Sequence, residues 1–313
     1  MSDTALTTPT ADTANNTGAD PRSVWITAME ELTAEEGYFH PLGLQHYVFF
    51  ADLGTTLLVS FERLADILAR PGQMPLANAH AEARGWSHVC VIADGDTWFR
   101  DPAVYGYFDR LVDETFLEDF DQVLFFGAGM GGYAACAYSV AAPGAHVLAL
   151  NPRATLNPSQ TGWDRRDLAA RKLDFTARYG YAPDMLEGAA QVSVIHDPTM
   201  PAEAGQAALF RAPYITRLSA RHMGDQLAGS FAQMGLLPAL LDGAMKGTLT
   251  PIVFATLWRQ RRDNPTYLRG LLHKAETAGR SGLEMMICKS VTRRMRAPRF
   301  ERRLARLMPT DAG

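Results

Sequence analysis

The chain has 313 residues, a formal net charge of −4, 47% hydrophobic residues and 20% charged residues. These values are ordinary for a soluble globular protein with one large or two smaller domains, and the small net charge favours no particular class of partner. No apolar run approaches the roughly 20 residues that a membrane helix needs, so we expect no transmembrane segment.

The amino terminus and the cysteines bear on the compartment. Residues 1–22 lack the basic start and apolar core of a signal peptide, and their Thr, Ala, Asp and Asn content predicts a disordered tail. Cys90, Cys136 and Cys288 lie far apart in apolar surroundings, without a CxxC pair or metal-ligand spacing. We therefore expect buried free thiols in a reducing compartment, and a cytoplasmic protein.

Strand and helix patterns alternate along the first part of the chain. The predicted elements are a helix over 23–36 capped by Ser23, a turn at 37–41, strands at 46–51 and 56–61, a buried strand at 88–93, a loop carrying Asp94 and Asp96, and a helix over 105–120. A turn signal between the first two strands predicts that they form a hairpin or lie as neighbours.

The alternation continues beyond residue 120. The predicted elements are strands at 123–126, 147–150, 190–196 and 214–218, and helices over 131–142, 168–179, 203–210 and from near Gly224. This order predicts an α/β domain over 23–248, in which helices cover both faces of a mainly parallel sheet. Helical periodicity from Thr250 onward predicts two or three packed helices in a C-terminal segment, 249–313.

The C-terminal segment is basic. Residues 249–313 hold 14 Lys or Arg against 5 Asp or Glu. We expect a last helical piece over 289–306, where Lys289, Arg293, Arg296 and Arg303 fall partly on one face. A solvated helix end explains this pattern most simply, and contact with an anionic membrane, nucleic acid or acidic polymer is the alternative.

The most informative stretch is 121–152, which reads DQVLFFGAGMGGYAACAYSVAAPGAHVLALNP. An apolar strand, a glycine-rich turn, a helix of small residues and a second apolar strand together form one βαβ unit. Two kinds of site use this shape. One is a dinucleotide-binding loop, and the other is the nucleophile elbow of hydrolases.

The dinucleotide interpretation uses the GxGxxG spacing of Gly127, Gly129 and Gly132, which would bind FAD or NAD in an oxidoreductase. Two features count against it. Strands precede the unit, which usually opens its domain. The second strand is followed by Asn151 rather than by the acidic residue that would bind a ribose.

The elbow interpretation uses the GxSxG spacing, with Gly127 and Gly131 flanking position 129. It predicts earlier strands, an acid after a late strand and a histidine after the last strand. Asp197 and His222 satisfy those two positions in the expected chain order.

Backbone groups near the elbow complete this interpretation. The end of the early strand, at Phe61 and Glu62, and Met130, which follows the elbow position, are the candidates for an oxyanion or ligand site.

With these residues in place, the chain resembles the α/β-hydrolase superfamily, and especially small bacterial esterase-like members whose elbow reads G-x-S-M-G-G-Y-A-A. The matching residues are GAGMGGYAA at 127–135, ALNP at 149–152, Asp197-Pro198 and His222, and the resemblance covers about 47–237. It implies a nucleophile at position 129, where this chain has glycine. A glycine has no side chain that could attack a substrate.

The sequence therefore leaves open whether this protein is an enzyme. The first hypothesis is a hydrolase-like protein without the standard reaction, which binds a small or acyl-bearing ligand and needs no cofactor. The second is an active hydrolase that uses water or a displaced nucleophile with Asp197 and His222. The third is the FAD- or NAD-dependent oxidoreductase. The ligand and the oligomeric state do not follow from the sequence.

Other side chains receive structural interpretations. Cys136 and Ser139 fall within a helix that packs on the sheet, whereas Ser60, near a strand end, is a better substitute nucleophile. Asp94 and Asp96 could act on a bound water, although a solvated turn explains them more simply. His196 beside Asp197 lacks a third ligand at metal spacing. Trp98 and Trp163 lie in loops, where they could line a pocket or cover the core.

Overall fold

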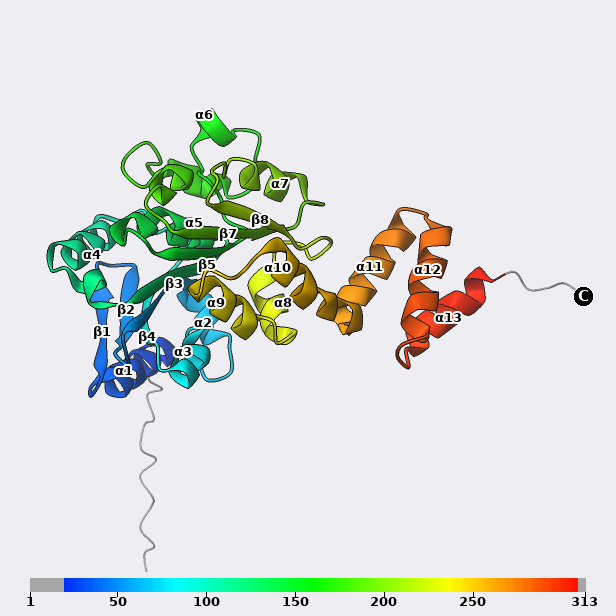
Figure 1. The fold of residues 1–313 in the computed structure, drawn as a ribbon, viewed down its shortest axis with the longest axis horizontal. Helices are drawn as coiled ribbons and strands as arrows, with labels where there is room; N and C mark the ends of the chain where they lie inside the picture. Colours follow the sequence, from blue (N-terminus) through cyan, green and yellow to red (C-terminus); the bar gives the residue numbers. More distant parts are fainter. Residues whose placement is uncertain (1–19, 309–313) are drawn as a thin grey trace, which may run out of the picture.

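The computed structural model describes residues 20–308, and its centre is one eight-stranded sheet (Figure 1). The strand order is β1-β2-β4-β3-β5-β6-β7-β8. β1 and β2 are antiparallel to each other, β2 is antiparallel to β4, and all strands from β4 to β8 across the sheet are parallel. The strands are β1 (Gly37–Leu42), β2 (His46–Ala51), β3 (Thr56–Arg63), β4 (Ser87–Ala93), β5 (Gln122–Ala128), β6 (His146–Leu150), β7 (Gln191–His196) and β8 (Ile215–Ser219).

Helices cover both faces of this sheet, which confirms the predicted fold class. α4, α5 and α7 lie on one face, and α1, α2, α3, α8, α9 and α10 lie on the other (Figure 1). The helices of the body are α1 (Pro21–Thr33), α2 (Leu64–Leu68), α3 (Asn78–Arg84), α4 (Pro102–Asp113), α5 (Met130–Tyr138), α6 (Pro158–Thr161), α7 (Pro201–Ala207), α8 (Leu227–Gln233), α9 (Leu237–Met245) and α10 (Pro251–Leu257).

Alternation along the central strand β5 explains why two cores form. Val123 and Phe125 pack on the face of α4 and α5, whereas Leu124 and Phe126 pack on the face of α9. Successive strand residues point to opposite faces, so an uninterrupted apolar run is the pattern of a strand buried on both sides. The small residues of α5 let this helix lie close against the sheet, and every one of its residues is buried.

The first elements differ from the sequence-based prediction. α1 starts at Pro21, and its cap is Asp20, whose carboxylate accepts the N–H of Arg22, rather than Ser23. Residues 37–41, predicted as a turn, form most of β1. Pro41 is compatible with this position because β1 is an edge strand, where a proline nitrogen can face away from the neighbouring strand.

The predicted pairing of the first two strands is also wrong. β4 lies between β2 and β3, so the segments 46–51 and 56–61 form neither a hairpin nor neighbouring strands. The turn at 52–55 starts a crossover to the other side of β4, a choice that local turn residues cannot specify.

Three predicted helices are shorter than expected. The helix over 105–120 ends at Asp113, two residues before Thr115 adopts a left-handed φ of 55°. Within 168–179 only a single 3₁₀ segment forms, Leu168–Lys172. The piece over 289–306 is divided between two helices, because Pro298 starts a new helix after a break.

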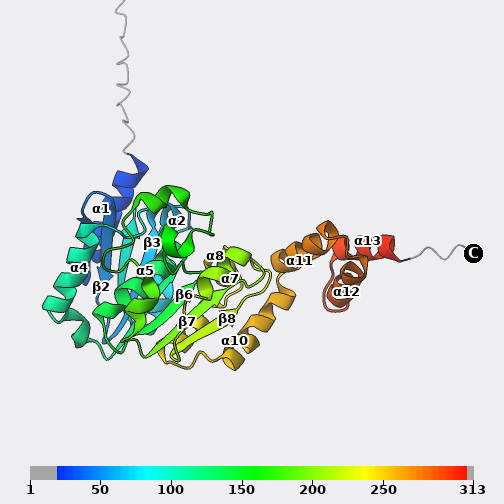
Figure 2. The same cartoon turned by 90° about the horizontal axis from the view of Figure 1, so that it is seen from above.

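The C-terminal helices α11 (Pro265–Thr277), α12 (Ser281–Thr292) and α13 (Pro298–Leu307) form an arm that projects from the body (Figures 1 and 2). The arm has a small core of its own, in which Leu268, Leu272, Ile287, Cys288 and Phe300 are buried. Few bonds join it to the body, among them the Tyr267 hydroxyl donating to the carbonyl of Arg221.

All three cysteines are buried and free. Among residues 20–308, no helix has the length and apolar character required to cross a membrane. The predicted tail at 1–22 falls mostly on residues 1–19, outside the described part of the chain.

Candidate functional site

The site begins at a sharp turn between β5 and α5. Gly129 is the single residue between them and has φ 56° and ψ −115°. Its N–H donates to the carbonyl oxygen of Leu150 at the end of β6, 2.9 Å away. A strained strand-to-helix turn of this kind raises its central residue above the carboxyl edge of a parallel sheet.

Glycine occupies the positions of this turn for two different physical reasons. A Cβ at Gly127 would overlap the carbonyl of Gly131, and a Cβ at Gly131 would overlap the carbonyl of Phe61. A Cβ at Gly129 would meet no atom within 4 Å. The flanking glycines are therefore required by close backbone packing, whereas the central position has room for a side chain.

The predicted oxyanion residues lie together. Gly131 packs against the end of β3, so the start of α5 lies beside Phe61 and Glu62. The backbone N–H groups of Met130 and Gly131 have no hydrogen-bond acceptor within residues 20–308. These N–H groups carry the partial positive charge of a helix N-terminus.

A cavity of about 520 Å³ lies over the elbow. Its wall comes from the end of β3, α2 with the segment after it, the loop after β4, the elbow, the segment after β6 and the start of α8. The cationic residues in this wall are Arg63, Arg70 and Arg153. Sites of open parallel sheets lie at this carboxyl edge. A second cavity, of about 580 Å³, lies at the opposite edge, where β5 and β6 begin.

All three of these arginines are paired with carboxylates, and the partner of Arg153 in the cavity wall is Asp167 at 3.3 Å. Arg63 contacts Asp66 at 2.9 Å and Asp96 at 3.4 Å, and Arg70 forms an ion pair with Glu62. Burial raises the pKa of Glu62, and Arg70 partly offsets this effect. The whole wall contains three arginines and five carboxylates, so it is polar with an excess of acidic residues.

The structure brings Asp197 and His222 together through the backbone of His222. The buried Asp197 carboxylate accepts the N–H groups of Thr199 at 2.9 Å, His222 at 3.0 Å and Gly224 at 2.9 Å. Burial acts to raise the pKa of Asp197, but these hydrogen bonds outweigh it and the pKa is lowered. The carboxylate therefore organises the loop after β8.

The His222 ring is separate from this interaction. His222 has a left-handed φ of 66°, and neither it nor Asp197 lines the cavity over the elbow. Burial and the nearby Lys274 lower the pKa of the His222 ring. In this conformation no acid–base relay runs from Asp197 through the His222 ring to position 129.

Ser60 belongs to a hydrogen-bonded chain of polar side chains that the sequence did not predict. Its hydroxyl bonds to Nε2 of His88 at 2.8 Å, and Nδ1 of His88 bonds to the side-chain oxygen of Asn78 at 3.0 Å. Ser60 and His88 have no exposed surface. Burial lowers the pKa of His88 to about 3, so the ring is neutral at pH 7.

The remaining candidate residues lie in different parts of the structure, some in the core and some at the cavity. Cys136 and Ser139 are buried, and the Ser139 hydroxyl donates to the carbonyl of Cys136 at 3.0 Å. Asp96 and Trp98 line the cavity, whereas the Asp94 carboxylate pairs with Arg22 at 2.6 Å.

Trp163 is half exposed and lies against Gly205. His196 is buried. The described residues contain no group of three or more His, Cys, Asp or Glu side chains that could hold a metal ion.

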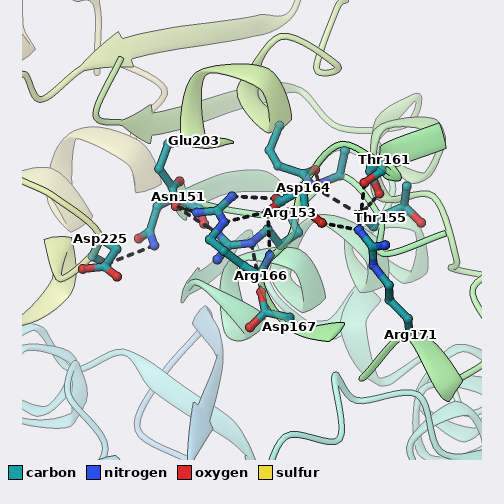
Figure 3. Close-up of polar contacts among 12 residues, drawn as sticks. Asn151, Arg153, Thr155, Thr161, Asp164, Arg166, Asp167, Arg171, Glu203 and Asp225 are labelled. Atoms are coloured by element: carbon teal, nitrogen blue, oxygen red, sulfur yellow. Dashed lines mark hydrogen bonds and ion pairs between the residues drawn. The ribbon is translucent and has the colours of Figure 1, made fainter. Parts of the chain in front are cut away.

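A polar network that was not predicted from the sequence follows β6 (Figure 3). Glu203 accepts from Arg153 at 3.1 Å and also pairs with Arg166, which in turn binds Asp164. Burial would raise the pKa of Asp164, but hydrogen bonds from Arg166 and Gln206 lower it to about 2. The sequence features that could have indicated this network are Arg153 and the two adjacent arginines at 165–166.

Comparisons of the sequence with protein-family models and with characterised proteins gave no match. Among solved structures, a chain of the glycosylation-associated Gap123 complex of Streptococcus agalactiae is 15% identical, with a TM-score of 0.42 over 63% of this chain and 44% of that one. This chain therefore matches less than half the length of that relative.

Two further similar structures are covered almost completely. Fluorophosphonate-binding serine hydrolase F of Staphylococcus aureus is 10% identical, with a TM-score of 0.44 over 66% of this chain and 95% of that one. S-formylglutathione hydrolase of Agrobacterium tumefaciens is 12% identical, with a TM-score of 0.40 over 67% and 99%. The parallel sheet, the helices on both faces and the elbow turn give this chain an α/β-hydrolase-like fold.

Proposed function

We propose that this protein is a hydrolase-like protein without the elbow nucleophile, and that it binds a small or acyl-bearing ligand in the cavity over Gly129. The proposal is carried by the combination, at Gly129, of an elbow-like backbone conformation with the lack of a nucleophilic side chain. The turn has the backbone geometry of an elbow and open space above it, but no hydroxyl or thiol. Covalent hydrolysis of the usual kind requires such a group beside a base.

The cavity supports the ligand-binding part of this proposal. About 520 Å³ is within the size range of small-molecule sites, which combine a concave shape with a few convergent polar groups. The helix N-terminus at Met130 and Gly131 and the guanidinium of Arg153 are such groups. A ligand bound there would lie where a hydrolase holds its substrate.

A fluorophosphonate probe and an activated ester test the proposal directly. The purified protein should show no burst of product and no labelled residue. Stoichiometric labelling of any serine, with turnover of the ester, would overturn it. The absorbance spectrum of the same preparation tests the oxidoreductase hypothesis, because a bound flavin absorbs visible light.

The Gly129→Ser variant tests the second hydrolase hypothesis. Position 129 has room for the added side chain. Gain of probe labelling would indicate that an acid and a base, with Asp197 and His222 as the candidates, are poised to activate a hydroxyl. We expect no gain, because the Asp197 carboxylate binds the backbone of His222 rather than its ring.

We also propose that the arm binds an anionic partner. The arm, residues 265–307, holds 11 Lys or Arg against 3 Asp or Glu, whereas residues 1–264 hold 19 against 30. Arg293, Arg296, Arg299 and Arg302 are exposed on the arm. Clustered cations of this kind attract polyanions in a salt-dependent manner.

Elution from a heparin column measures this second proposal. Changing Arg293, Arg296, Arg299 and Arg302 to Gln should lower the eluting salt concentration clearly. A control that changes Arg178, an exposed arginine of the body paired with Asp109, should not. Equal elution of both variants and the parent chain would contradict the proposal.

A further inference from the structure

Arg153 is a buried arginine that leaves one of its nitrogens available to the cavity. It is 7% exposed and lines the cavity over the elbow. Its Nε donates to Asp167 at 3.3 Å, and its Nη1 donates to Glu203 at 3.1 Å and to the carbonyl of Asn151 at 3.2 Å. Its Nη2 has no hydrogen-bond partner among residues 20–308.

The surrounding bonds fix this guanidinium in place. Glu203, which is 1% exposed, is shared between Arg153 and Arg166, so one buried carboxylate serves two cations. Bonds from Nε and Nη1 restrict the side chain to one orientation. A group fixed in this way loses little conformational freedom when a ligand binds.

The elbow presents a second set of donors to the same space. The Met130 and Gly131 N–H groups at the start of the nine-residue helix α5 have no acceptor in the described chain, and nothing stands within 4 Å of a Cβ position at Gly129. The bond from the Gly129 N–H to Leu150 ties the elbow to the segment that carries Arg153. Donors from the two elements therefore line one cavity.

Within residues 20–308, none of the carboxylates of the cavity wall is hydrogen-bonded to Arg153 Nη2 or to the N–H groups of Met130 and Gly131. Glu62 is bound by Arg70 and by the N–H of Leu76 at 2.6 Å, and Asp66 and Asp96 pair with Arg63. The side chain of Asp225 is exposed. Asp167 and Glu203 pair with Arg153 and offset its charge, but neither binds Nη2.

We propose that the cavity binds an oxyanion, either a carboxylate or a phosphate, between Arg153 Nη2 and the N–H groups at the start of α5. The anion occupies the volume that a nucleophilic side chain would fill at position 129. This inference rests on the proposed ligand-binding function and names the chemical class of the ligand. Charge-assisted hydrogen bonds from a planar guanidinium and a helix N-terminus are the donors that such groups prefer.

Calorimetric titration of the full chain at low ionic strength tests this inference with two probes, inorganic phosphate and butyrate. We expect saturable one-to-one binding of at least one probe. Tighter binding of butyrate would identify the acyl carboxylate, and tighter binding of phosphate would identify a phosphoryl ligand. Chloride at the same concentration is the reference anion.

Two variants locate the binding. Arg153→Lys should weaken it about tenfold, because an ammonium cannot keep the bonds of the guanidinium fork and also reach the cavity. Gly129→Ser should weaken it by a similar factor, since the new side chain fills the anion's place. Arg178→Lys, on the body surface, is the matched control and should leave binding unchanged.

The inference is overturned by the absence of saturable binding to the parent chain, or by equal affinity in the parent chain and Gly129→Ser. If Arg153→Lys does not fold, Gly129→Ser decides the result. Failure here is distinct from failure of the proposed function. A chain that binds neither anion and also resists the fluorophosphonate overturns only this inference, whereas ester turnover with a labelled serine overturns the proposed function.

Discussion

Two regions of the molecule each have half of what nucleophilic catalysis requires. The elbow has a cavity, open space and a helix N-terminus, but its central residue has no side chain. The chain from Ser60 through His88 to Asn78 has a hydroxyl, an imidazole and an orienting amide in hydrogen-bond contact, but no exposed surface at the serine or the histidine. Residue types and mutual distances alone therefore do not make a catalytic site, because a substrate must also reach them.

The environment of each region explains its chemistry. Burial lowers the pKa of His88 to about 3, which keeps the ring neutral and able to satisfy Ser60 and Asn78. Such a chain stabilises the interior. The elbow instead presents N–H groups without a protein acceptor to a cavity, where a ligand can accept them.

Substitutions of the elbow glycines should give the largest effects. Gly127→Ala and Gly131→Ala each force a Cβ into a backbone carbonyl, and we expect a loss of roughly 3–5 kcal/mol or failure to fold. Gly129→Ala meets no atom and should cost only roughly 1–2 kcal/mol, from its positive φ. Urea denaturation measures all three. Equal losses would show that the central position is not open.

The dependence of stability on pH tests the buried chain. The pKa of His88 is about 3 in the folded state, below its ordinary value of about 6.5, so only the unfolded state binds this proton between those values. Stability therefore falls as the pH falls, and His88 contributes about 1.4 kcal/mol per pH unit between pH 6 and pH 4. Chemical denaturation of the parent chain and of His88→Gln should give different slopes. Parallel slopes would contradict a buried neutral His88.

Removal of the Ser60 hydroxyl should have a smaller effect. Ser60→Ala leaves Nε2 of His88 without a partner, at a cost of roughly 1–3 kcal/mol. Ser139→Ala, which removes a hydroxyl bonded only within its own segment, should cost less. Reaction with a fluorophosphonate should be unchanged in both variants. Loss of reactivity in Ser60→Ala alone would show that the buried chain is a catalytic site.

Much of the fold follows from local sequence patterns. The apolar runs around Phe125, Leu148 and Val194 predict strands because each is buried on both faces. The placement of β4 between β2 and β3 does not follow from such patterns, since it depends on packing across the whole sheet. The segment 37–41, predicted as a turn, forms an edge strand because it pairs with β2, and this pairing does not follow from the local sequence.

The candidate site, like the fold, could be predicted only in part from the sequence. Chain order predicts that Asp197 and His222 follow late strands, and the structure brings them into contact. Chain order cannot tell whether a carboxylate meets a histidine ring or its backbone, which depends on the φ of 66° at His222. Arg153 and Glu203 are 50 residues apart, so their contact requires the fold.

The body and the arm carry net charges of opposite sign, so the molecule has a negative end and a positive end. The formal net charge of −4 is the small difference between an acidic body and a basic arm that extends to one side of it (Figure 2). Such a molecule has a large electric dipole moment, so an external electric field exerts a torque on it in addition to a net force. Near a negatively charged surface the protein is expected to rotate so that the arm arrives first and the body faces away.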